Sequence, residues 1–400
     1  MSFLRKVIER IIESMLTISG WVASITILLI IVFLFKEGAG LFNTNIVEKG
    51  YILCVHTNNP VNTLTSNQIK LMYDSEIENW KEVGGNDEYI MLFRLDDIFN
   101  YYDDEEFGEN FEHLAEKLGE VIASHSDIIA FIPAEYFPEG NSEVRLLNTG
   151  KHKFSDFIAG TEWIPTATPA PLFGVLPLIT GTLLVSFFAV LLALPFGLGV
   201  AVFLAEVAHP RVRKILKPMI ELLAGIPSVV YGFFGLVVIV PFVQNTFNLA
   251  VGETALAGSI VLAIMALPTI ITIAEDSMRA APRSMREASL ALGGSHWQTI
   301  YRVVIPYASS GIMAAVILGI GRAIGETMAA LMVTGNAALI TGSLFSPVRT
   351  IPATIAAELG EAPMGGAHYE ALFILGCILF IITMMGSIGA EFLANKRRTS

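Results

Sequence analysis

The chain has 400 residues, of which 53% are hydrophobic and only 16% are charged, and its mean hydropathy is +0.61. This composition excludes an ordinary soluble domain, whose charged share is about 25%, and indicates a protein that crosses a membrane several times. The net charge of −12 is confined to one segment, described below, and predicts no nucleic-acid partner.

Six apolar stretches are long enough to cross a hydrocarbon core, which takes about 20 helical residues. The expected spans cover residues 15–35, 176–205, 219–243, 254–273, 311–333 and 371–392. The first could be a cleaved signal peptide, but its apolar run exceeds the roughly 7–15 residues of signal peptides, so we expect a retained anchor. The sequence thus predicts an all-α polytopic membrane protein.

The basic residues predict that both termini are cytoplasmic, because Lys and Arg concentrate in cytoplasmic loops. They gather at both chain ends and after the second and fourth spans: Arg5, Lys6, Arg10, Arg211, Arg213, Lys214, Lys217, Arg279, Arg283, Arg286, Lys396, Arg397 and Arg398. Residues 36–171 then lie outside the cell, and the excess of acidic residues belongs to this segment. We expect a multi-pass protein of the cytoplasmic (inner) membrane, surrounded by the lipid bilayer.

The loop after the fourth span, residues 282–306, predicts two short helices joined by a glycine turn. Ser284 with Glu287, and Ser295 with Gln298, have the spacing of capping boxes, and Gly293 is suited to a left-handed helix end. Proline at the end of the loop predicts a turn back into the membrane. Such a loop could also be an amphipathic helix that rests on lipid headgroups.

One motif in this loop resembles the EAA motif of ABC-importer permeases: Glu287-Ala288-Ser289, then Gly293, then Val303-Val304-Ile305-Pro306. The resemblance implies that the first helix docks on a separate ATPase subunit through Glu287, Ala288, Ser289 and Gly293. Ser289 stands where the motif has alanine. No G-x-x-x-x-G-K-[ST] loop occurs in the chain, so we expect ATP to be hydrolysed by a partner and no cofactor or metal to be bound here.

Two further segments, residues 221–232 and 319–328, resemble the C-type permease of phosphate importers. The resemblance implies a type I ABC importer permease fold and inorganic phosphate as the substrate. It also implies a homologous A-type permease, two copies of a cytoplasmic ATPase and an extracytoplasmic phosphate-binding protein as partners. An importer of sulfate or molybdate, or a membrane receptor that signals without transport, remain the alternatives.

The fifth span contains the charged residues Arg322 and Glu326, four positions apart, which would lie on one face of a continuous helix. Ionised groups inside a membrane are costly unless they are paired or face water, and an arginine fork suits an oxyanion. We expect Arg322, Glu326 and Thr327 in the translocation path, although a structural ion pair is an equal alternative on the residues alone. Gly321 and Gly325 form a G-x-x-x-G pattern, which is typical of close helix packing.

The acidic segment between the first two spans predicts a small α/β domain, which gives the organisation 1–40, 41–168 and 169–400. We expect strands over residues 51–55, 89–93 and 128–132 and helices over 66–73 and 107–122. Residues 64–73, 79–85 and 127–133 resemble part of one lobe of the phosphate-binding protein. Asp96 and Asp97 follow the second strand and would repel phosphate, so we expect a domain that binds no ligand and acts as a docking surface or a spacer.

Overall fold

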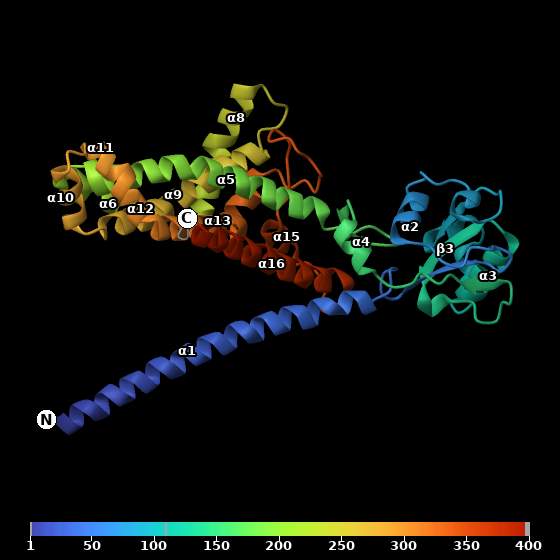
Figure 1. Cartoon of the computed structure of the whole chain (residues 1–400). Coiled ribbons are helices and arrows are strands. Elements are labelled where there is room, and N and C mark those ends of the chain that lie inside the picture. The colour runs from blue at the N-terminus through green and yellow to red at the C-terminus, as the bar shows by residue number, and fades with distance from the viewer. Residues whose placement is uncertain (1, 109, 397–400) are drawn as a thin grey trace. The chain divides into compact units, whose positions relative to one another are not determined.

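Long apolar helices make up most of the chain in the computed structural model, which describes residues 2–108 and 110–396 (Figure 1). The chain divides into two units. The membrane unit contains residues 1–38, 176–362 and 372–400, and the inserted unit contains residues 39–175 and 363–371. Arg397 and Arg398 of the predicted C-terminal basic cluster lie outside the described residues.

Five helices of the described chain are long and apolar enough to cross a membrane, and a bent pair makes a sixth. Four of the five are α1 (Ser2–Gly38), α5 (Leu176–Val202), α9 (Ala255–Arg279) and α16 (Ala367–Lys396). The fifth combines α7 (Ser228–Phe234), the π-helical segment η7 (Gly235–Ile239) and α8 (Val240–Phe247). The bent pair joins residues 296–307 to α13 (Ser309–Gly325) at 69°. This agrees with the six predicted spans.

Helices α5 and α9 lie side by side at the centre of the membrane unit (Figure 1). Gly197 makes this contact possible, because a Cβ atom there would lie 2.8 Å from Ile270 of α9. Close approach at small residues is how helices associate where lipid removes the hydrophobic driving force. The buried core continues across α5, α7, α9 and α14 (Met328–Val333).

Two predicted spans differ from the structure. The third was expected from residue 219, but residues up to 224 belong to α6 (Pro210–Ala224), and the span begins after Pro227. The fifth was expected to be continuous over residues 311–333, but α13 ends at Gly325 and α14 begins at Met328. Hydropathy averages side chains, so it does not register a backbone break inside an apolar run.

The loop between α9 and α13 has the predicted helix, turn and helix. Helix α10 (Arg283–Ala291) is followed by α11 (His296–Thr299), the π-helical segment η8 (Ile300–Val304) and α12 (Ile305–Tyr307). Ser295 and Gln298 form the predicted capping box. The predicted cap at Ser284 is wrong, because Pro282 occupies the N-cap and fixes the backbone angle there.

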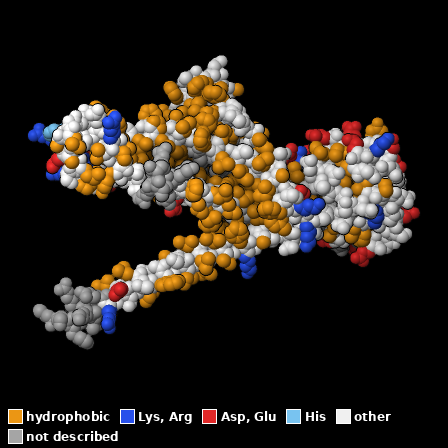
Figure 2. Space-filling model, viewed as in Figure 1, with side chains coloured by type: hydrophobic (Ala, Val, Ile, Leu, Met, Phe, Trp, Pro, Cys, Tyr) orange, Lys and Arg blue, Asp and Glu red, His pale blue; other side chains and the backbone are white. Residues whose placement is uncertain are grey.

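The membrane unit has a further short helix after α14, which is α15 (Ile351–Glu358). Thr350 caps it by accepting from the backbone N–H of Ala353. An ion pair of 2.8 Å between Arg349 and Glu358 connects its two ends. Figure 2 shows hydrophobic side chains over the long helices of this unit.

The inserted unit is built on a four-stranded sheet with the order β2-β3-β1-β4. The strands are β1 (Tyr51–His56), β2 (Met91–Arg94), β3 (Ile128–Pro133) and β4 (Val144–Leu146). β1 is antiparallel to β3 and β4, and Cys54 pairs with Ala130 and Leu146, whereas β2 is parallel to β3. A second, two-stranded sheet joins β5 (Trp163–Ile164) and β6 (Leu172–Phe173).

Alternating strand residues bury both faces of this sheet. Leu53 and Val55 share a core with α2 (Ser66–Tyr73), and Cys54 shares another with α3 (Leu114–Ser124). The three predicted strands and the helix at residues 66–73 are confirmed. The helix predicted from residue 107 begins only at Leu114, because Gly108 has φ +82° and ends the preceding 3-10 turn η4 (Asp104–Phe107).

Candidate translocation and coupling sites

Arg322 lies in the last turn of α13, next to α9. Its Nη1 donates a hydrogen bond of 3.1 Å to Oγ1 of Thr269. Thr269 follows Pro268, the proline inside α9, and both helices are closely packed here because Gly319 lies against Ile270. Spans four and five therefore meet around this guanidinium.

Glu326 is not on the same helix face as Arg322, which corrects the prediction of an i, i+4 pair. The helix ends at Gly325, and Glu326 has an extended backbone with φ −70° and ψ 127°. Within the described chain, no ion pair of 4.0 Å or less joins the two side chains. Arg322 is thus held by a neutral hydroxyl, and its charge is not matched by this carboxylate.

Hydroxyl groups support the break between α13 and α14. Ser186 of α5 donates to the carbonyl of Ala323 at 3.3 Å, and Thr327 donates to the carbonyl of Gly325 at 3.2 Å. Serine and threonine commonly satisfy backbone groups that a broken membrane helix frees. Thr327 also lines a groove of about 550 Å³ together with residues of α15 and α16, whereas Arg322 and Glu326 are not among its lining residues.

Within the described residues, Gly321 and Gly325 do not take part in close helix packing. A Cβ atom at either position would meet no heavy atom of the described residues within 4 Å. Gly319, two positions before Gly321, is in close contact with α9, since its Cβ would lie 2.9 Å from Ile270. At this end of α13 the close approach to α9 is therefore made at Gly319.

The loop of residues 282–306, called the coupling loop from here on, is held in shape by short polar contacts. Ser289 Oγ lies 2.9 Å from Thr299 Oγ1, so the residue that replaces the motif's alanine ties α10 to α11. Gly293 has φ +85°, the left-handed conformation that the glycine turn requires. The amide N–H of Gly294 donates to the carbonyl of Ser289 at 3.0 Å. Glu287 and Ala288 are exposed on α10.

Large apolar side chains are exposed on the same loop. None of the nine residues of α10 is buried. The exposed set contains Met285, Leu290, Leu292, Trp297 and Tyr301, and Leu292 is 90% exposed. Figure 2 shows Lys and Arg side chains at the end of the membrane unit that carries α10. Several exposed large apolar side chains on one loop, with charged side chains nearby, favour a protein docking site.

Sequence reasoning missed the partners that hold these residues. Thr269 and Ser186 were not singled out, although each hydroxyl lies inside an apolar span, which is a usable signal. Two groups of ion pairs at the helix ends near α10 were also missed. Arg213 and Lys217 of α6 contact Glu275 of α9 at 2.7 and 3.0 Å, and Arg286 contacts Glu206 at 2.6 Å.

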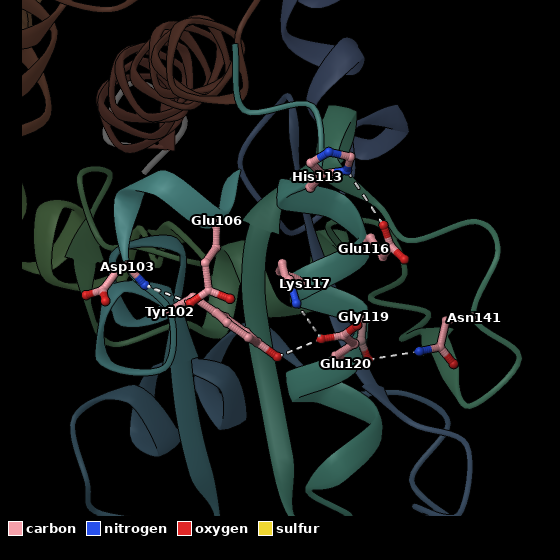
Figure 3. Close-up of polar contacts among 9 residues, drawn as sticks. All are labelled: Tyr102, Asp103, Glu106, His113, Glu116, Lys117, Gly119, Glu120 and Asn141. Atoms are coloured by element: carbon pink, nitrogen blue, oxygen red, sulfur yellow. Dashed lines mark hydrogen bonds and ion pairs between the residues drawn. The ribbon is translucent and has the colours of Figure 1, made fainter. Parts of the chain in front are cut away.

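In the inserted unit, a carboxylate occupies the turn after β2. Asp97 Oδ2 accepts the backbone N–H of Arg94 at 2.7 Å, at the start of the 3-10 helix η3 (Leu95–Asn100). A neighbouring acidic surface is itself hydrogen bonded, as Figure 3 shows. There Tyr102 donates to Glu120 at 2.7 Å, which raises the pKa of Tyr102 to about 12. Asp97 places negative charge where an anion would need N–H donors.

Comparisons with known proteins agree with the membrane unit. The family model described as "Binding-protein-dependent transport system inner membrane component" matches residues 193–399. The probable ABC transporter permease protein YqgH of Bacillus subtilis is 40% identical over 243 residues, which cover 61% of this chain and 78% of the relative. The phosphate transport system permease protein PstC of Mesorhizobium japonicum is 40% identical over 248 residues, 57% of this chain and 75% of the relative.

A solved structure with some likeness is the inward-facing MetNI methionine ABC transporter. It is 18% identical, covers 56% of this chain and 94% of the solved chain, and has a TM-score of 0.42.

Proposed function

Because the chain belongs to the family of binding-protein-dependent transport system inner membrane components, we propose that it is the C-type permease subunit of an ATP-driven phosphate importer. The predicted fold class, an ABC importer permease with a small inserted α/β unit, is confirmed. The chain is a multi-pass membrane protein. Its relatives named as phosphate permeases, at 40% and 37% identity, favour phosphate over other substrates.

One observation supports an oxyanion as the substrate independently of those names, which is the hydrogen bonding of Arg322. A guanidinium inside a membrane span costs roughly 3 kcal/mol unless it is compensated. Arg322 has a neutral hydroxyl as its hydrogen-bond partner, so it retains positive charge and free donors for an oxyanion. We assign Arg322 to the translocation path, with Glu326 and Thr327 at the adjoining helix break.

The coupling loop supports a separate ATPase as the source of energy. Its exposed apolar patch and the rigid turn at Gly293 give a partner a defined surface to hold. We infer that two ATPase copies dock on the pair formed by this chain and an A-type permease, through Glu287, Ala288, Ser289 and Gly293. ATP is used by those subunits, and this chain binds no cofactor.

The proposed mechanism is alternating access, with both termini and the coupling loop in the cytoplasm. An extracytoplasmic binding protein delivers phosphate. Closure of the ATPase pair then displaces α10, and the membrane helices open inward past Arg322. The inserted unit binds no phosphate in this scheme, because Asp97 takes the backbone donor after β2.

Two alternatives lead to different measurements. A sulfate or molybdate importer would use the same arginine chemistry, and it would transport those anions in place of phosphate. A receptor without transport function would need neither Arg322 inside the membrane nor a docking loop for an ATPase.

The decisive experiment measures radiolabelled phosphate uptake in cells that also express the partner subunits. We compare the wild type with Arg322→Gln, and with Arg279→Gln as the matched control, because Arg279 is an exposed arginine at the end of α9. Loss of a charge-assisted contact of about 2 kcal/mol predicts uptake reduced roughly 30-fold or more in Arg322→Gln and unchanged in the control.

Assembly is checked by copurification of the complex. Normal uptake in an assembled Arg322→Gln complex would remove this residue from the path. Uptake of sulfate or molybdate without phosphate by the wild type would overturn the substrate.

A further inference from the structure

A single guanidinium connects the coupling helix to the ends of two membrane spans. Arg286 of α10 binds Glu206 through Nη2 at 2.6 Å and through Nε at 3.2 Å. The same guanidinium donates to the carbonyl of Met278 at 2.9 Å and to the carbonyl of Ala281. Met278 lies in the last turn of α9, and Ala281 follows its C-cap.

Glu206 belongs to η6 (Phe203–Val207), the π-helical segment that ends α5. Its side chain is only 7% exposed, and that of Arg286 is 21% exposed. A carboxylate this buried requires a cation with good geometry, and the two-point contact with a guanidinium provides it. Arg286 thereby joins three elements, which are the end of α5, the end of α9 and α10.

Among the described residues, no side chain of α10 other than that of Arg286 makes a hydrogen bond or ion pair with α5 or α9. None of its residues is buried, so no apolar core holds it in place. The chain joins α10 to α9 through residues 280–282, and α10 also contacts α11 and η8, with a hydrogen bond from Ser289 to Thr299 of α11. Without Arg286, a displacement of α10 would reach α5 and α9 only indirectly, through these adjoining segments of the loop.

We propose that Arg286 is the positioning residue that makes α10 and the ends of α5 and α9 move as one body. Displacement of α10 by the ATPase subunits then moves spans two and four directly. This inference rests on the proposed function, since it assigns a residue to the coupling step of the same transporter. It also gives Glu206 a role, because its ion pair with Arg286 transmits the displacement of α10 to span two.

The test reconstitutes the complete transporter with its binding protein in lipid vesicles and measures phosphate imported per ATP hydrolysed. The variants are Arg286→Gln, Arg286→Lys and Glu206→Gln, and Arg279→Gln is the control. We expect Arg286→Gln to assemble and hydrolyse ATP while import per ATP falls roughly tenfold, within the usual range of coupling effects. A lysine cannot bind both carboxylate oxygens of Glu206 and two backbone carbonyls together. The import per ATP of Arg286→Lys should therefore lie between the values of the wild type and Arg286→Gln.

An unchanged ratio of import to hydrolysis in Arg286→Gln would overturn the proposal, even if both rates fell together. If Arg286→Gln fails to assemble, Glu206→Gln decides, because it keeps the side-chain volume and removes only the charge. Hydrogen exchange in residues 283–291 of the assembled complex is a second readout. It should increase in Arg286→Gln and Glu206→Gln and stay unchanged in the control.

The two proposals fail separately. Absence of phosphate import by the wild type overturns the function, while hydrogen exchange still tests the link. Unchanged exchange in both variants overturns the link, whatever the substrate is.

Discussion

At the scale of single residues, Arg322 has a different kind of hydrogen-bond partner from the arginines at the helix ends. Arg213 and Arg286 each bind a buried carboxylate, whereas Arg322 binds the hydroxyl of Thr269. A hydroxyl orients a guanidinium without neutralising it. This difference supports the proposal that Arg322 binds the transported anion, whereas Arg213 and Arg286 hold helix ends together.

His152 gives the inserted unit a dependence on pH. Burial lowers the pKa of His152 to about 4, and its ring packs against Phe173 at 5.3 Å. Its Nε2 is buried and has no hydrogen-bond partner among the described residues. The folded pKa lies below the unfolded one, so this stability is fully present above about pH 6.5 and is lost as the pH falls towards 4.

We expect this unit to lose up to about 3 kcal/mol between pH 6.5 and 4, and His152→Asn to remove most of that dependence. Hydrogen exchange of residues 163–173 in the full-length protein, corrected for the intrinsic effect of pH, measures it. An equal slope in both proteins would assign the pH dependence to other groups.

At the scale of elements, the turn after α10 depends on the left-handed backbone of Gly293. An alanine there costs about 1–2 kcal/mol, because its Cβ crowds the following carbonyl. Gly293→Ala should therefore misplace α11 and weaken copurification of the ATPase. Gly199→Ala is the matched control, since Gly199 lies exposed in α5 and a Cβ there meets open space. Equal ATPase recovery from both variants would show that the turn is not needed for docking.

The sequence predicted the elements whose signals are local. Six apolar runs and the cap at Ser295 are visible in the chain itself, and they are confirmed. The break after Gly325 could not be predicted from the local sequence. One of its supports is the hydroxyl of Ser186, which lies 137 positions from the Ala323 carbonyl that it binds. The start of the third span was misplaced for a similar reason. Residues 219–224 continue its apolar run, but they belong to α6, whose Lys217 binds Glu275 of α9.

The candidate site was predicted in part. Arg322 and the coupling motif came from residue type and resemblance, and the comparisons bear out the family. Which groups surround Arg322 could not be deduced, because pairing with Glu326 assumed an unbroken helix. The roles of Arg322, Glu326 and Thr327 stay predictions until transport is measured.

At the scale of the whole molecule, the inserted unit has its own sheet and its own cores on both faces of that sheet. Deletion of residues 50–160 removes this sheet and leaves the membrane unit intact. If the inserted unit is a spacer, uptake and its dependence on the concentration of the binding protein should be unchanged. We expect this result, because the sheet and both of its cores are contained within the inserted unit.

A higher concentration of binding protein needed for half-maximal uptake by the deletion variant would instead identify a docking surface. Membrane insertion of the variant is the control, and it is measured by extraction of the protein with detergent and immunoblotting.

The interruption between α13 and α14 also determines which side of span five can touch acyl chains. A helix end leaves carbonyl groups that no intrahelical N–H reaches, and hydrocarbon supplies no donor to replace it. Ser186 and Thr327 serve two of these carbonyls from within the chain. We therefore expect the break in span five to face protein or water and not acyl chains.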